Sequence, residues 1–272
     1  MASRAEDITH GFTRVDQTAD PRFFIEFLDA RRTAEGEREV KQLILDMLDV
    51  QPSARILDVG CGTGDDVREI ATLIGATGQI VGVDASDALV AESKRRATGS
   101  NLPVEFLLGD VRKLDFPNAA FDRIRTDRVL MFVPEIEAAM AEMVRVLRPG
   151  GLLVASEIDH ELRFADSRLT DIDRKVQAAW VASHPQPRLG RQLSWLFAKQ
   201  GLLNVKSMPQ VVRPPYQLFK SFISGFLSAA IGRGELLQVE ADAWLSDIAE
   251  LAAAGVFTNG AVVFTVRGEK RS

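Results

Sequence analysis

Residues 55–66 are the most informative stretch of the chain, and they read Arg55-Ile56-Leu57-Asp58-Val59-Gly60-Cys61-Gly62-Thr63-Gly64-Asp65-Asp66. A short apolar run is followed by a glycine at every second position, and a helical pattern begins just after it. In an open α/β sheet, ligands bind outside the carboxyl ends of the strands. Glycines at that place let the backbone come close to a ligand. The stretch therefore predicts a cofactor-binding loop between a strand and a helix.

The spacing of these glycines narrows the choice of ligand. A dinucleotide-binding loop needs Gly-x-Gly-x-x-Gly, but counting from Gly60 places Asp65 at the third glycine position. No Lys-Ser or Lys-Thr pair follows, so the loop is not a P-loop either. Asp65 and Asp66 instead put two carboxylates at the helix N-terminus, where a pyrophosphate would otherwise bind. The loop suits a zwitterionic ligand with an amino group better than a phosphate.

Short apolar runs and helical patterns alternate along the chain on both sides of this loop. Strands are predicted at 55–59, 79–84, 104–108, 123–126, 151–158, 202–212 and 261–266. Helices are predicted at 21–32, 37–49, 67–73, 88–96, 136–147, 189–200, 216–231 and 241–253. Nearly continuous apolar strands separated by amphipathic helices predict a parallel sheet covered on both faces. The last two helices interrupt what is otherwise a hairpin of the final two strands.

Two further carboxylates follow predicted strands. Asp84 ends the second strand, where a carboxylate can accept both hydroxyls of a ribose. Asp110 follows the third strand, where an acid can receive the amino group of an adenine. Because the carboxyl ends of parallel strands meet at one edge of the sheet, these residues and the glycine loop predict a nucleoside site.

The stretch from Ser53 to Ile158, which carries these residues, resembles the class I S-adenosylmethionine-dependent methyltransferases. The matching runs are 57–64, 83–86, 109–111 and 146–151. Within that class the chain looks like the branch that modifies quinones, sterols and other natural products. The resemblance implies S-adenosyl-L-methionine as cofactor. It also implies an α/β fold, a doubly wound, Rossmann-like sheet of seven mostly parallel strands with an antiparallel last strand.

The same resemblance implies roles for residues of the loop and the strand ends. Asp58 and Gly60 to Gly62 would hold the methionine part, Asp84 would bind the ribose, and Asp110 with Val111 would bind the edge of the adenine. Thr126, at the end of the fourth strand, would face the cofactor. The complete cofactor set is Asp58, Gly60, Cys61, Gly62, Asp84, Ala85, Ser86, Gly109, Asp110, Val111 and Thr126.

The chain is divided into one core and its covering segments. Residues 1–52 form an N-terminal helical arm, 53–159 the cofactor-binding core, and 160–188 a lid insertion. Residues 189–272 complete the sheet and carry the helical insertion at about 214–254. Segments that cover the carboxyl end of such a sheet commonly exclude water and bind substrate.

Composition excludes several classes of protein. The net charge is −5, which does not suit binding to a phosphate backbone, so we expect no nucleic-acid partner. The single cysteine, Cys61, allows no disulfide within the chain and no cysteine-based metal cluster, and no metal site is predicted. The sequence shows neither a secretory signal nor an apolar run long enough to span a membrane, so a cytoplasmic protein is expected. The sequence leaves open whether the protein forms a homodimer.

Catalysis by methyl transfer needs little more than positioning of the acceptor. Many relatives of this branch carry a histidine where Phe132 stands, so no base is expected at that position. His160 is the preferred general base, with Asp159 as its orienting partner, because both follow the fifth strand on the ligand-binding side. His184 could reach the site from the lid, and His10 lies near the N-terminus.

The candidate acceptor site combines aromatic and basic side chains from the covering segments. Its predicted substrate residues are Phe23, Phe24, Arg128, Phe132, Trp180, Phe219 and Phe222. Arg31, Arg188 and Arg191 are further candidates for binding a carboxylate. The sequence thus predicts an enzyme that methylates an oxygen or carbon of a small, largely apolar or aromatic molecule. Methylation of tRNA or another macromolecule, and a non-catalytic cofactor-binding homologue, are the alternatives.

Overall fold

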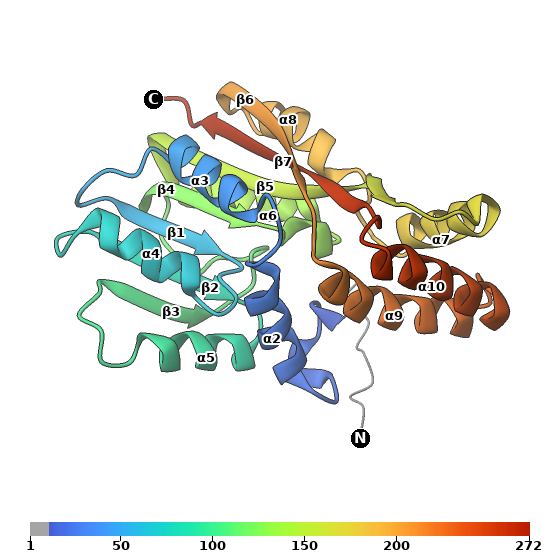
Figure 1. Cartoon of the computed structure of the whole chain (residues 1–272). Coiled ribbons are helices and arrows are strands. Elements are labelled where there is room, and N and C mark those ends of the chain that lie inside the picture. The colour runs from blue at the N-terminus through green and yellow to red at the C-terminus, as the bar shows by residue number, and fades with distance from the viewer. Residues whose placement is uncertain (1–10) are drawn as a thin grey trace.

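The computed structural model describes residues 11–272 and contains one seven-stranded sheet (Figure 1). The strand order is β3-β2-β1-β4-β5-β7-β6. The strands are β1 (Arg55–Val59), β2 (Gln79–Asp84), β3 (Val104–Leu108), β4 (Phe121–Asp127), β5 (Leu147–Ala165), β6 (Leu203–Val212) and β7 (Asn259–Glu269). The first five are parallel, and β7 is antiparallel to both β5 and β6. The predicted α/β fold is confirmed, including its antiparallel last strand.

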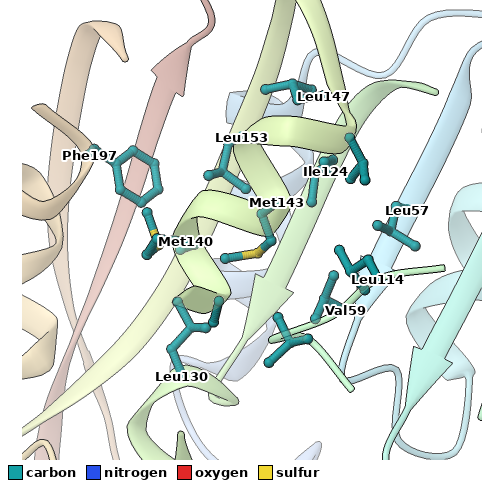
Figure 2. Close-up of a cluster of buried hydrophobic side chains, with 14 of the residues drawn as sticks. Leu57, Val59, Leu114, Ile124, Leu130, Met140, Met143, Leu147, Leu153 and Phe197 are labelled. Carbon is teal, nitrogen blue, oxygen red and sulfur yellow. The ribbon is translucent and has the colours of Figure 1, made fainter. Parts of the chain in front are cut away.

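Helices cover both faces of the sheet because successive strand residues point to opposite sides. In β1, Ile56 packs toward α3 (Glu37–Leu48), α4 (Asp65–Ile74) and α5 (Asp87–Ala97). Its neighbour Leu57 packs toward α6 (Ile136–Val146) and α8 (Leu189–Lys199). Figure 2 shows this second cluster, with Leu57 and Val59 of β1 on one side, Met143 of α6 in the middle, and Met140 of α6 beside Phe197 of α8 on the other side. Both methionines are fully buried, so truncating either to alanine would cost about 2–5 kcal/mol.

The N-terminal arm is anchored to the core by helix capping. Its described part contains η1 (Val15–Gln17), α2 (Pro21–Arg31) and α3. Asp16 accepts hydrogen bonds from the backbone N–H groups of Asp87 (2.9 Å) and Ala88 (3.0 Å) at the start of α5. A carboxylate at a helix N-terminus satisfies unpaired N–H groups and complements the helix dipole. This contact places α2 beside the carboxyl ends of the strands.

Three helices form a separate helical cap at the end of the sheet toward which the parallel strands point (Figure 1). They are α7 (Thr170–Ala182), α9 (Tyr216–Gly232) and α10 (Gln238–Ala253). Their facing sides share a hydrophobic cluster around Trp180, Phe226 and Trp244, all of which are buried. The cap therefore has its own core, and it covers the edge of the sheet where the glycine loop lies.

The structure corrects the expected start of the lid. The fifth strand was expected to end at residue 158, but β5 continues to Ala165 because β7 starts at Asn259 and pairs with it. The register shifts between Asp159 and Phe164, so the strand has an irregularity at this point. The remaining part of the predicted lid is largely α7. Within residues 11–272, no helix has the length and apolar character needed to cross a membrane.

Candidate active site

A cavity of about 530 Å³ lies at the carboxyl ends of β1, β2 and β4, beneath α2 and the helical cap. One part of its wall is formed by the glycine loop, Asp84 and Asp110. Another part carries aromatic side chains from the arm, from the loop after β4 and from the cap. This volume is in the range of typical small-molecule sites.

The glycine loop is held against the end of β2 by its own backbone. The N–H groups of Gly60 and Cys61 both donate to the carbonyl oxygen of Val83, at 2.7 and 3.1 Å. Gly60 has a φ of 72°, and a Cβ on it would lie 2.1 Å from Cγ2 of Val129. Left-handed backbone and close packing both require glycine here. The loop therefore presents bare backbone to the cavity.

Asp84 is oriented by backbone N–H groups. Its Oδ2 accepts from Gly62 (2.8 Å) and its Oδ1 accepts from Ser86 (3.0 Å). Burial raises the pKa of Asp84, although these hydrogen bonds act in the opposite direction. Each carboxylate oxygen has two lone pairs, so Asp84 can still accept hydrogen bonds from a ligand.

Next to the loop lies a group of ten charged side chains that we call the charged end. Its members are Arg31, Arg32, Glu37, Lys41, Asp58, Asp65, Asp66, Arg125, Asp127 and Arg128. Five are cationic and five anionic, and they alternate in space. Arg125 Nη1 lies 2.8 Å from Asp58 Oδ2, and Arg125 Nη2 lies 2.9 Å from Asp66 Oδ2.

The pKa values at the charged end follow from burial and pairing. Burial raises the pKa of Asp58 to about 7, against the effect of Arg125. Burial also opposes ionisation of Asp66, but Lys41 and Arg125 outweigh it and lower the pKa of Asp66. A balanced, water-poor set of opposite charges suits a ligand that carries both an amino group and a carboxylate.

Most of the predicted cofactor residues line the cavity. They are Asp58, Gly60, Cys61, Gly62, Asp84, Ala85, Gly109, Asp110 and Val111. Two do not. The Ser86 hydroxyl caps α5 by accepting from Leu89 N–H, and it donates to Asp16. Thr126 is fully buried within the sheet. The prediction for Ser86 is corrected to helix capping, and Thr126 does not line the cavity.

His160 and His184 lie together on the aromatic side of the cavity. Their rings stack with centroids 3.6 Å apart. Trp180 Nε1 lies 3.1 Å from Nδ1 of His160, and the indole nitrogen can only donate. The backbone carbonyl oxygen of Trp180 lies 2.8 Å from Nδ1 of His184 and can only accept. Neutral His160 therefore carries its proton on Nε2, whereas His184 carries its proton on Nδ1.

Burial lowers the pKa of His160 well below its usual range, and nearby His184 and Arg163 act in the same direction. The ring is therefore neutral at physiological pH. Its Nε2 has no hydrogen-bond partner among the described residues. His160 thus presents an N–H donor at the cavity, and Trp180 is the residue that orients it.

Asp159 is not the partner of His160, which corrects the predicted pair. The two residues are consecutive in β5 and point to opposite sides of the sheet. Asp159 is fully buried against α8, where its Oδ1 accepts from Arg191 Nη2 at 2.7 Å. Arg188 is also directed elsewhere, since its Nε lies 3.4 Å from Glu161 Oε2. Neither arginine lines the cavity.

The predicted substrate residues divide into two groups. Phe132, Trp180, Phe219, Phe222 and Arg128 line the cavity. Phe23 and Phe24 do not, because α2 turns that side toward η1 and α5, where Phe24 is fully buried. His10 lies outside the described residues.

Arg128 is already neutralised in the structure. Its Nη2 lies 2.8 Å from Glu37 Oε2, and its Nε lies 2.9 Å from Asp127 Oδ1. Arg31 lines the cavity too, 3.6 Å from Asp127. Both belong to the charged end rather than to the aromatic side.

Sequence reasoning missed several residues of the site. Phe27 lines the cavity from the same helix as Phe23 and Phe24, and Phe12 joins it from before η1. The helical spacing of Phe27 and Arg31, which both line the cavity, was a usable signal, because residues four apart share a face of a helix. Phe12 gave no comparable signal.

Glu157 of β5 was also missed, and it organises the loop after β4. It is fully buried and accepts hydrogen bonds from the N–H groups of Val129 (3.0 Å) and Leu130 (2.8 Å). These residues lead into η2 (Leu130–Phe132), which brings Phe132 to the cavity. Burial raises the pKa of Glu157 to about 8, against the effect of its backbone donors.

Comparison with known proteins agrees with this geometry. A family described as "Methyltransferase domain" matches residues 56–151. The chain is 33% identical over 258 residues to the "Uncharacterized 37.1 kDa protein in transposon TN4556" of Streptomyces fradiae, covering 89% of this chain and 70% of that one. It is 34% identical over 119 residues to the ubiquinone/menaquinone biosynthesis C-methyltransferase UbiE of Ectopseudomonas mendocina (strain ymp). This match covers 43% of this chain and 46% of that protein. The chain thus spans under half the length of that curated relative.

A solved structure shows the same fold. It is phosphoethanolamine N-methyltransferase 2 of Haemonchus contortus in complex with S-adenosyl-L-methionine, with a TM-score of 0.63 and 16% identity over 96% of this chain and 60% of that chain. The doubly wound sheet and its glycine loop define a nucleoside-binding enzyme of the Rossmann-like class. The chain belongs to the class I S-adenosylmethionine-dependent methyltransferases. Its cofactor is S-adenosyl-L-methionine.

Proposed function

We propose that this methyltransferase acts on an oxygen or carbon of a small, largely apolar or aromatic molecule. The observation that carries the proposal is that one cavity joins the glycine loop and Asp84 to a wall of aromatic side chains. We call this wall the aromatic end, and its members are Phe12, Phe27, Phe132, Trp180, Phe219 and Phe222. The similarity to a quinone C-methyltransferase supports the same class of acceptor.

The residues present fit the cofactor. Asp84 would accept hydrogen bonds from the ribose hydroxyls, because its carboxylate is fixed by backbone donors and faces the cavity. Asp110 and Val111 would contact the adenine. Asp58 and the charged end would hold the methionine, whose amino and carboxylate groups match the alternating charges. When bound, the cofactor supplies an electrophilic methyl group on a sulfonium.

The aromatic end would hold the acceptor and exclude water. Phe12 and Phe132 have ring centroids 5.5 Å apart, which joins the arm to the loop after β4. Phe27 and Phe222 have centroids 6.2 Å apart, which joins α2 to the cap. Three segments far apart in sequence thus meet over one cavity. Orientation of the acceptor toward the methyl carbon is the main contribution that such a site can make.

The two histidines lie together where the acceptor would bind. His160 would donate a hydrogen bond from Nε2 to an acceptor oxygen and orient it. His184, whose ring stacks on that of His160, would help to hold the His160 ring in place. His160 as general base, the sequence-based hypothesis, does not fit its tautomer.

Calorimetry with S-adenosylhomocysteine and a methylation assay test this proposal. We expect the cofactor product to bind at micromolar concentrations or tighter. We expect a panel of phenols and hydroxylated quinones to yield a methylated product by mass spectrometry with labelled cofactor. Absence of binding would overturn the proposal. Methylation confined to RNA or protein, with none of the small molecules modified, would overturn the acceptor class.

A further inference from the structure

Arg163 occupies an unusual position in the cavity wall. It lies in the part of β5 that extends past the core, and only 8% of it is exposed. Its guanidinium carbon lies 4.4 Å from the ring centroid of Trp180 and 5.1 Å from that of Phe219. It lines the cavity at the aromatic end, away from the ion pairs of the charged end.

Among residues 11–272, no carboxylate forms an ion pair with this guanidinium. Its Nη1 donates to Oε1 of Gln177 at 3.3 Å, and the buried Nη2 has no hydrogen-bond partner in the same part of the chain. Asp173 is the acid that influences it, and Asp173 accepts a hydrogen bond from Trp244 Nε1 at 3.0 Å.

The other buried arginines of the cavity are different. Arg125 and Arg128 each have carboxylate oxygens within 3 Å. Burial lowers the pKa of Arg163 to about 10, so its side chain still carries a full charge at neutral pH. Buried charges in proteins are normally paired or bound to a ligand. Stacking on two aromatic rings offsets only part of the desolvation cost.

His160 adds a second unused donor to the same wall. Its neutral ring cannot balance the charge of Arg163, and its Nε2–H is buried and unpaired. Trp180 contacts both residues, through Nε1 for His160 and through its ring face for Arg163. Two donors without an anionic partner among the described residues thus face the aromatic end of the cavity.

We propose that the acceptor carries an oxyanion conjugated to its apolar ring, a carboxylate or an acidic phenolate, that pairs with Arg163. His160 Nε2–H donates a second hydrogen bond to the same molecule. A planar guanidinium matches the geometry of a planar oxyanion and forms two parallel hydrogen bonds to a carboxylate. This inference rests on the proposed function, because it specifies the class of its acceptor.

Matched anionic and neutral probes test the inference on protein saturated with S-adenosylhomocysteine. Titration calorimetry compares 2-naphthoate with 2-naphthamide, and 4-nitrophenolate with nitrobenzene. We expect at least one anion to bind about tenfold or more tightly than its neutral counterpart. The pair that shows the preference distinguishes a carboxylate from a phenolate.

Variants assign the preference to Arg163. We expect R163Q to abolish it, R163K to keep part of it, and R168Q, at an exposed arginine, to leave it unchanged. Equal affinities within both pairs, no binding of any probe, or a preference that survives R163Q would overturn the inference. The wild-type comparison stands by itself where R163Q does not fold. Failure of S-adenosylhomocysteine to bind would contradict the proposed function. Normal binding of S-adenosylhomocysteine without a preference for the anionic probes would contradict this inference alone.

Discussion

Gly60 and Val129 pack so closely that a Cβ on the glycine would lie 2.1 Å from Cγ2 and 2.8 Å from Cγ1 of the valine. This contact ties the glycine loop after β1 to the loop after β4. Val129 in turn donates its N–H to the carboxylate of Glu157 on β5. The cofactor side and the acceptor side of the cavity are therefore joined by direct packing.

Gly60→Ala should damage both loops. The new methyl group would clash with Val129. The alanine would also have to adopt the left-handed φ of 72° that glycine has at this position. We expect a loss of about 2–4 kcal/mol in unfolding free energy and about tenfold or more in affinity for S-adenosylhomocysteine. Urea unfolding and calorimetry measure the two effects.

Gly201→Ala is the matched control, because Gly201, just after α8, has a φ of 75° but no heavy atom within 4 Å of the added Cβ. It should lose only about 1 kcal/mol, from backbone strain, and keep its cofactor affinity. The double variant G60A/V129A should recover part of the G60A loss. Equal losses in G60A and G201A would show that packing against Val129 is unimportant.

Asp84→Asn should weaken binding of both S-adenosylhomocysteine and adenosine by about tenfold or more, because the two ligands share the ribose. Lys41→Met, at the charged end, should weaken S-adenosylhomocysteine and leave adenosine unchanged. D87N, at an exposed acid three residues along, is the control. Titration calorimetry separates these cases. Adenosine affinity unchanged in D84N would refute the ribose assignment.

Glu157→Gln should change how stability depends on pH. Burial raises the pKa of Glu157 from 4.5 to about 8 in the folded protein. Its protonated form thus favours folding below about pH 4.5, and this contribution is lost as the pH rises through 8. Between these two pH values, ionisation of Glu157 lowers the free energy of unfolding by at most about 1.4 kcal/mol per pH unit. The variant should therefore lose less stability than the wild type between about pH 5 and pH 8.

Urea unfolding at several pH values measures this slope, with Glu161→Gln as the control at a partly exposed acid. Asp58 shifts in the same direction, so E157Q should reduce the slope without abolishing it. Identical slopes in wild type and E157Q would contradict a raised pKa at Glu157.

The sheet was predictable because each of its strands is an apolar run bounded by a turn signal. β1, β2 and β3 begin and end at the predicted residues. The charged end was only partly predictable, since Arg125 and Asp127 interrupt an apolar strand but nothing in the sequence gives their partners. Lys41, which donates to Asp127, lies in α3, 86 residues earlier in the chain, and Arg125 pairs with Asp58 of β1 and Asp66 of α4, so only the fold brings these charges together.

The acceptor side was harder to predict because it depends on where β5 ends. With the strand ending at Ile158, Asp159 and His160 were free to share a loop. In the longer strand they point to opposite faces, and Arg163 enters the cavity through the irregularity between Asp159 and Phe164. No periodic pattern marks such an irregularity, so the face of each following residue cannot be read from alternation.

His160 and His184 should show opposite tautomers, which nitrogen NMR of the imidazoles can observe directly. We expect the proton of His160 on Nε2 and that of His184 on Nδ1, because Trp180 donates to one ring and accepts from the other. Trp180→Phe removes the indole donor and keeps an aromatic ring beside Arg163. The variant should weaken the preference of His160 for the tautomer protonated on Nε2. It should leave the tautomer of His184 unchanged, because the partner of that ring is a backbone carbonyl.

The same spectra test the charge state of His160. Burial lowers its pKa, so the folded ring should stay neutral as the pH falls through 6.5, where an unfolded histidine becomes protonated. The stability that this neutral ring contributes is present above 6.5 and is lost as the pH falls below it. His160→Gln should therefore lose less stability than the wild type between about pH 6.5 and pH 5. A His160 ring that protonates near pH 6.5 in the folded protein would contradict its burial beside Arg163, and with it the donor role proposed for Nε2.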